Sequence, residues 1–220
     1  NNGQLGDLTT IDRPYPIVAY SGAKEISTGY YDSSCAINNE DRINCWGGNS
    51  SFQQDITQVS SAFKISSGLG FNCAITTWSN NGSRQVYCAG KNTYGQLGDG
   101  STTTTQFPAE VKGITNAKMI SAGFRHACAI VYNNLVKCWG LNGYNQIGLA
   151  NSVVPELEES KSTYPVTYPN ISSAVNVSAG VDHTCALLAG NFVKCWGLND
   201  YGQLGDGTIS NSSTPVTVQF

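Results

Sequence analysis

The chain has 220 residues, of which 12% are charged, and its formal net charge at pH 7 is −3. It carries no basic stripe, and such a composition argues against nucleic acids and anionic membrane surfaces as partners. No run of about 18 apolar residues occurs, so we expect no membrane insertion.

The first 20 residues contain a turn sequence that recurs along the chain. It begins as Gly-Gln-Leu-Gly-Asp at residues 3–7 and recurs in fuller or weaker form at residues 94–100, 144–148 and 201–207. An element containing proline follows each copy, at Pro16, Pro108, Pro165 and Pro215. Proline has no N–H group to donate, so this element fits an edge strand.

The aspartates of this turn are Asp7, Asp99 and Asp206. We expect them to close the turn through bonds from side chain to backbone. A calcium site is disfavoured because each copy supplies one carboxylate, whereas calcium takes several oxygen ligands.

All eight cysteines fall in a second phrase, which occurs four times. Each copy joins Cys-Ala-Ile or Cys-Ala-Leu to a later Cys-Trp-Gly, except that the second copy ends in Cys88-Ala-Gly. A period of about 50 residues is typical of solenoids, propellers and arrays of small repeats. Short runs of β-branched and aromatic residues between Gly and Asn predict strands joined by tight turns.

The cysteine spacing predicts hairpins. The midpoints of the third and fourth pairs fall at Asn133-Asn134 and Gly190-Asn191, residues that tolerate positive φ in tight turns. Paired cysteines then face each other across the hairpin, at a separation that suits a disulfide. Zinc knuckles would need closer spacing. The expected disulfides are Cys35–Cys45, Cys73–Cys88, Cys128–Cys138 and Cys185–Cys195.

An even, regular set of cysteines indicates an oxidising compartment. Sequons for N-linked glycans point the same way. They stand at Asn49, Asn81, Asn170, Asn176 and Asn211. We expect glycans at Asn81 and Asn211 first, because both lie in accessible turns or loops, and least at Asn176, which begins a strand that should line the core. The protein is therefore expected to be secreted, extracellular or at the cell surface.

The phrases occur in the order I-S-x-G, H-x-C-A-[IL], [VI]-x-C-W-G and Y-G-Q-L-G-D-G, which resembles the RCC1-type (regulator of chromosome condensation 1) repeat. The resemblance implies one four-stranded antiparallel blade per repeat, normally seven to a ring, and the paired cysteines look like its secreted branch. We expect an all-β, RCC1-like β-propeller or open propeller arc of about four blades. Its single domain, 1–220, would contain the units 1–47, 48–90, 91–140, 141–197 and a closing segment 198–220.

Residues 1–20 repeat the pattern of residues 200–220, so both ends hold the same connecting segment. Three interpretations remain: a fragment of a larger propeller, a small closed ring, or an open arc whose ends meet other molecules. In the third, the N-terminal segment lacks a preceding hairpin and the C-terminal segment lacks a following strand. Joining such unlike ends gives a ring or a filament.

No catalytic constellation emerges, and we expect no enzyme activity, cofactor or metal. The resemblance implies that His126 and His183 bond to neighbouring backbone. Trp46, Trp139 and Trp196 are expected in the core. Trp78, Tyr30 and Tyr31 lie in loops and are candidates for contact with a partner.

We therefore predict a secreted, non-enzymatic scaffold that associates with itself, head to tail, in an extracellular fibre, appendage or matrix. The alternative is a secreted propeller that recognises another extracellular protein, as an inhibitor or an adhesin does. Guanine-nucleotide exchange, implied by nuclear relatives, fits poorly with paired cysteines and the lack of a basic tail.

Overall fold

The computed structural model describes residues 2–18, 21–30, 33–47, 59–77, 83–148, 160–168 and 170–219. Within these ranges the chain forms fifteen β-strands, β1 to β15, and no helix. A helix long and apolar enough to span a membrane is accordingly not found there. The prediction of an all-β fold is confirmed.

The strands form four antiparallel sheets, which we call blades 1 to 4. Blade 1 contains β1 (Ala23–Thr28), β2 (Ser33–Asn38) and β3 (Ile43–Gly47). Blade 2 contains β4 (Ala62–Ser67), β5 (Phe71–Thr76), β6 (Gln85–Gly90) and β7 (Thr105–Glu110). Blade 3 contains β8 (Met119–Ala122), β9 (His126–Ile130), β10 (Val136–Leu141) and β11 (Lys161–Thr167). Blade 4 contains β12 (Ala174–Ala179), β13 (His183–Leu188), β14 (Phe192–Gly197) and β15 (Ser212–Thr217).

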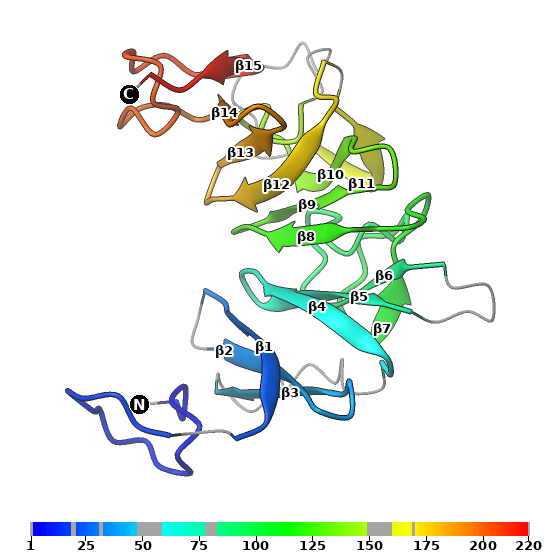
Figure 1. The fold of residues 1–220 in the computed structure, drawn as a ribbon, viewed down its shortest axis with the longest axis vertical. Helices are drawn as coiled ribbons and strands as arrows, with labels where there is room; N and C mark the ends of the chain where they lie inside the picture. Colours follow the sequence, from blue (N-terminus) through cyan, green and yellow to red (C-terminus); the bar gives the residue numbers. More distant parts are fainter. Residues whose placement is uncertain are drawn as a thin grey trace.

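The blades follow one another in a curved row, and the two chain ends lie at opposite ends of it (Figure 1). The first strand of each blade contacts the first strand of the next, from β1 to β4, β8 and β12. Among the described residues, blades 1 and 4 lie at opposite ends of the row, so the four blades form an open arc (Figure 1).

Each disulfide joins the two middle strands of one blade. The cysteines of every pair stand directly opposite in the strand register. Their Cα atoms are 4.0–4.1 Å apart, and the four pairs are those predicted from the hairpin midpoints. No cysteine of the chain is left free.

The hydrophobic cores lie between blades rather than inside one blade. One cluster joins residues of blades 1 and 2, a second joins blades 2 and 3, and a third joins blades 3 and 4. Each cluster includes cysteines of at least one disulfide. A single sheet in this chain thus buries its faces only with the help of its neighbours.

One expectation is wrong. The element around Pro16 was predicted as an edge strand, yet residues 11–18 form no strand. Its equivalents β7, β11 and β15 each pair with the strand before them in the same blade. The segment at Pro16 follows no such strand within the described residues, so none of these residues offers it a ladder of hydrogen bonds.

Replacing Cys128 and Cys138 together by alanine should lower the free energy of unfolding by about 2–3 kcal/mol, the value for a short loop closed by a disulfide. Urea unfolding without reductant measures the change. The arc should still fold, because the other three blades keep their own bridges. Peptide maps showing a bridge between two repeats as the main species would contradict the blade assignment.

Candidate functional site

The surfaces that join consecutive blades are the most regular feature of the chain, and the copies on blades 1 and 4 that no described blade covers are the candidate site. The segment around the first strand of every blade reads Ala-x-x-Ile/Val-Ser-x-Gly, and the glycine directly follows the last residue of the strand. The aliphatic residue at the fourth position packs on the preceding blade. Ile65, Ile120 and Val177 are 5%, 6% and 4% exposed, whereas Ile26 of blade 1 is 72% exposed.

The serine of this motif makes a hydrogen bond to the next blade. Its Oγ accepts the backbone N–H of the residue before the next glycine, at 2.9 Å in all three contacts. The pairs are Ser27 with Ser67, Ser66 with Ala122, and Ser121 with Ala179. Ser178 of blade 4 is exposed and accepts no such bond from the described residues.

The glycine of the motif allows the blades to approach closely. A Cβ atom on Gly68 or Gly123 would lie 2.5 or 2.4 Å from the carbonyl oxygen of the equivalent glycine in the next blade. Real Cβ atoms do not come so near, so only glycine fits between the strands. Sequence reasoning used I-S-x-G as a strand marker and missed that its serine and glycine join the blades. Their presence in all four copies was the available signal.

The repeated tryptophans join each blade to the turn before it. Nε1 of Trp139 donates to the carbonyl of Gln96 at 2.8 Å, and Nε1 of Trp196 donates to that of Gln146 at 2.9 Å. Both indoles are fully buried, as expected for core residues. Trp46 of blade 1 is half-buried and makes the same bond, at 2.9 Å, to Gln4 near the N-terminus.

The N-terminal arm, residues 2–18, therefore has at blade 1 the place that the turn of the preceding blade has at blades 3 and 4. Ser34 Oγ donates to the Gln4 carbonyl at 3.1 Å, just as Thr184 Oγ1 donates to that of Gln146 at 2.8 Å. The arm packs less closely than such a turn, because Leu5 is 41% exposed whereas the equivalent Leu97 is fully buried. A groove of about 760 Å³ lies between the arm and β3, lined in part by Leu8 and Trp46.

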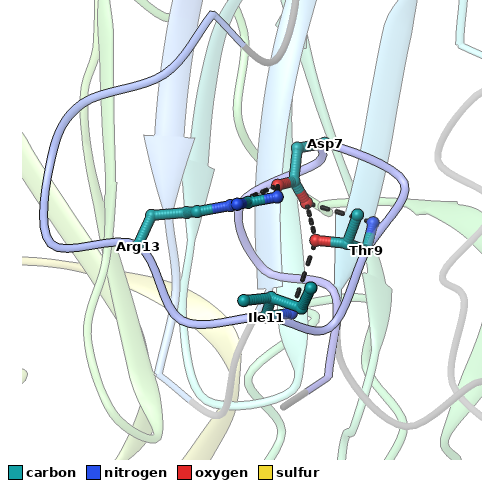
Figure 2. A network of polar contacts seen from close by, with 4 residues as sticks. All are labelled: Asp7, Thr9, Ile11 and Arg13. Atoms are coloured by element: carbon teal, nitrogen blue, oxygen red, sulfur yellow. Dashed lines mark hydrogen bonds and ion pairs between the residues drawn. The ribbon is translucent and has the colours of Figure 1, made fainter.

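The aspartates close their turns as expected. Asp7 accepts the backbone N–H of Thr9 at 3.0 Å and its hydroxyl at 2.7 Å, and pairs with Arg13 at 3.0 Å (Figure 2). The hydrogen bonds from Thr9, with help from Arg13, lower the pKa of Asp7. Asp206 makes the same bonds to Thr208. In the described part of the chain no three His, Cys, Asp or Glu side chains gather as a metal site.

His126 lies fully buried between blades 3 and 4. Its Nε2 is 2.9 Å from Thr184 Oγ1. Since Thr184 donates its own hydrogen to Gln146, Nε2 carries the proton and Thr184 accepts it. The bond thus goes to a side chain, not to the backbone that the resemblance implied. Nδ1 has no partner among the described residues, and burial lowers the pKa of His126 to about 3, with a smaller contribution from His183.

Of the predicted contact residues, only Tyr30 lies within the described residues; Tyr31 and Trp78 lie outside them. Tyr30 packs edge-on against Phe124, with ring centroids 5.4 Å apart. The guanidinium of Arg125 lies over Phe124 at 5.2 Å and over Tyr94 at 4.8 Å. These aromatic and cationic groups come from three blades, so they form one surface across the arc.

Asp182 interacts electrostatically with Arg125 and adds a carboxyl group to this surface. It accepts a hydrogen bond from Gln146 Nε2 at 3.1 Å. Burial raises the pKa of Asp182, while the positive charge of Arg125 and the bond from Gln146 act in the opposite direction.

Three of the five sequons can be located. Asn170, Asn176 and Asn211 are exposed, whereas Asn49 and Asn81 lie outside the described residues. The sequence disfavours a glycan at Asn176 because its strand should line the core. It lies on β12, whose outward face no described blade covers, so its side chain is exposed. Glycan occupancy stays a prediction for all five.

His126 should make folding sensitive to acid. Its folded pKa is about 3 and its unfolded value is about 6.5, so its contribution is complete above pH 6.5 and falls as the pH drops towards 3. The expected loss is about 1.4 kcal/mol per pH unit in that window.

The matched control is His126→Phe with Thr184→Ala, which copies the pair Phe71 and Ala127 buried between blades 2 and 3. This variant should lose that part of the pH dependence in urea unfolding. Equal slopes for both proteins between pH 6 and 4 would show that His126 is not buried as a neutral group.

The comparisons with known proteins agree with this geometry. The model of the "Regulator of chromosome condensation (RCC1) repeat" matches residues 85–130, 135–187 and 193–220. The Ultraviolet-B receptor UVR8 of Arabidopsis thaliana is 29% identical over the whole chain and 51% of its own length. The human probable E3 ubiquitin-protein ligase HERC4 is 31% identical over 61% of this chain but only 12% of its own length.

Among solved structures, human WBSCR16 superposes on the whole chain and on 61% of its own length, with a TM-score of 0.77 and 16% identity. The chain spans about half the length of UVR8, the curated relative named above. The repeat motifs, the stacked four-stranded sheets and these matches lead to one conclusion: the chain belongs to the RCC1 repeat family.

Proposed function

We propose that this chain is a secreted, non-enzymatic scaffold whose arc of blades binds other proteins, in the first place a second copy of itself. The observation that carries the proposal is the exposure of contact positions at the two ends of the arc. Ile26 is 72% exposed at a position that is at most 6% exposed in the other three blades. Apolar surface of this kind is favourable to bury against another protein.

The covalent structure supports a place outside the cell. All eight cysteines are paired within their own blades, a state that persists in oxidising compartments. The three sequons that can be located are exposed. Both features suit a glycosylated extracellular protein.

The polar groups that the repeats share support a non-enzymatic role. His126 holds two blades together, and the turn aspartates hold backbone N–H groups. The match to HERC4 covers 12% of that protein. These residues act in the framework and leave the exposed surfaces for binding.

A different protein partner is the second candidate, favoured by the surface around Arg125. Tyr30, Phe124 and Tyr94 surround its guanidinium, and aromatic and arginine side chains are the commonest anchors of protein interfaces. Tyr201, which occupies the position of Tyr94 in blade 4, is 92% exposed. This surface would suit a partner with carboxylates and aromatic rings.

The native mass distinguishes the two candidates. The chain, secreted from eukaryotic cells, should show a mass that rises with concentration in light scattering after size exclusion. Arg125→Ala should leave that association unchanged, because Arg125 lies on the second surface. A particle that stays at the mass of one chain at every concentration would contradict the scaffold and leave the recognition module.

Secretion should also attach glycans. We expect Asn211→Gln to remove the mass of one N-linked glycan, because Asn211 is exposed in the loop before β15. Intact mass before and after enzymatic deglycosylation measures it. A wild-type chain with no glycan at any of the five sequons would remove this support for the eukaryotic secretory route.

A further inference from the structure

We propose that Arg125 is the centre of a carboxylate-binding site, and that this site takes an acidic segment, carrying aspartate or glutamate, of a partner protein. The inference rests on the second candidate of the proposed function and names the chemistry of that partner. The site is formed by the loop between β8 and β9 and by the segment that follows β6. Contacts between blades 2, 3 and 4 hold it in place.

The fold uses the backbone of residue 125 and does not use its side chain. In blades 2, 3 and 4, the loop between the first two strands presents a carbonyl that accepts an N–H from the end of the third strand. The pairs are Gly70 with Lys91 at 2.8 Å, Arg125 with Leu141 at 2.9 Å and Asp182 with Leu198 at 2.9 Å. The same bond is thus made by a glycine, a cation and an anion. The arginine side chain is therefore available for another role.

Two aromatic rings hold the guanidinium of Arg125 in position. It lies 4.8 Å from the ring centroid of Tyr94 and 5.2 Å from that of Phe124. Among the described residues, no acceptor takes a hydrogen bond from the guanidinium and no carboxylate forms an ion pair with it. A guanidinium is planar, and its N–H donors form a fork that matches the two oxygens of a carboxylate. Arg125 therefore presents a fixed fork without an acceptor.

Asp182 is the acidic group that acts on Arg125 from within the chain, yet it does not fill the fork. The positive charge of Arg125 favours the ionised form of Asp182. The carboxylate of Asp182 instead accepts a hydrogen bond from Gln146 Nε2 at 3.1 Å, and it forms no ion pair with Arg125. A carboxylate from outside the chain would therefore meet donors that Asp182 leaves unused.

A second cation lies close to the site. Lys161 Nζ donates to the carbonyl of Thr93 at 3.3 Å, and the next residue, Tyr94, lies under Arg125. Lys161 is also paired with Leu141, whose N–H bonds to the carbonyl of Arg125, so the two cations are held by neighbouring strands. The chain as a whole has a net charge of −3. A local pair of cations on such a chain attracts an acidic segment to this place.

The surroundings of the fork favour a protein segment over a sulfated or phosphorylated glycan. Tyr30 is 41% exposed and packs edge-on against Phe124, with ring centroids 5.4 Å apart, so aromatic surface continues beside the guanidinium. Apolar side chains next to an aspartate or glutamate can be buried against these rings. The nearby carboxyl group of Asp182 also repels a doubly charged phosphate more than a singly charged carboxylate.

A displayed library of random peptides, selected on the secreted full chain, tests the site without knowledge of the natural partner. The recovered peptides should carry aspartate or glutamate beside an aromatic or aliphatic residue. The best of them is then synthesised with capped ends, together with a form in which glutamine or asparagine replaces each acid. Fluorescence anisotropy should show that the neutral form binds about tenfold or more weakly, the range for a hydrogen bond to a charged group.

Three variants of the chain locate the binding at Arg125. Arg125→Gln should weaken the acidic peptide about tenfold or more. Arg125→Lys keeps the charge without the fork and should recover only part of that loss. The matched control is Arg84→Gln, because Arg84 is an exposed arginine whose guanidinium lies 4.5 Å from the ring centroid of Phe63. This control should bind the peptide as wild type does, and circular dichroism should show all three variants folded.

Each outcome decides. Acidic peptides that need Arg125 but not Arg84 support the site. Recovered peptides without acids, equal loss in Arg125→Gln and Arg84→Gln, or a heparin oligosaccharide that displaces the peptide and binds more tightly would each overturn it. In those cases a chain that associates with itself in light scattering, or that binds neutral peptides, keeps the proposed protein-binding function. If no peptide is recovered and the chain also stays monomeric, the inference and the proposed function fail together.

Discussion

The structure depends on the burial of each blade's first strand against the blade before it. Ile65, Ile120 and Val177 carry this contact, together with a serine hydroxyl that takes a backbone N–H and a glycine that lets two strands approach. A blade of this size has too little interior of its own, so its stability is a property of pairs of blades. The contact also has a direction, because the two faces that meet are never alike. An arc built this way always ends in two different surfaces.

A second contact explains an irregularity of the sequence. The tryptophan of a blade bonds to the turn of the preceding unit, as Trp139 does to Gln96. Blade 2 has Ala89 in place of tryptophan, and the segment before it, residues 48–58, lacks the Gly-Gln-Leu-Gly phrase. The tryptophan and the Gly-Gln-Leu-Gly phrase are thus absent together from the sequence. The second repeat thus lacks in its sequence both partners of the bond that Trp139 makes to Gln96.

Most of the fold could be predicted from local patterns. Cysteines ten or fifteen residues apart around turn residues fixed the hairpins, because a hairpin's register follows from its turn. The strand expected at Pro16 failed, since a strand needs a partner that local sequence does not reveal. The bond from His126 to Thr184 joins residues 58 apart in sequence, so no spacing rule could supply it. The hydrogen bond from Ser34 to the carbonyl of Gln4 was hidden for the same reason.

The short reach of the disulfides has a consequence for how the protein is made. Eight cysteines can be paired in 105 ways, yet every bridge here closes within ten or fifteen residues of chain. During synthesis, both cysteines of a blade emerge before the first cysteine of the next, so each bridge can form while its neighbours are still unmade. Oxidation in order of emergence leads directly to the native pairing. For the same reason, a whole repeat can be gained or lost in evolution without leaving a thiol unpaired.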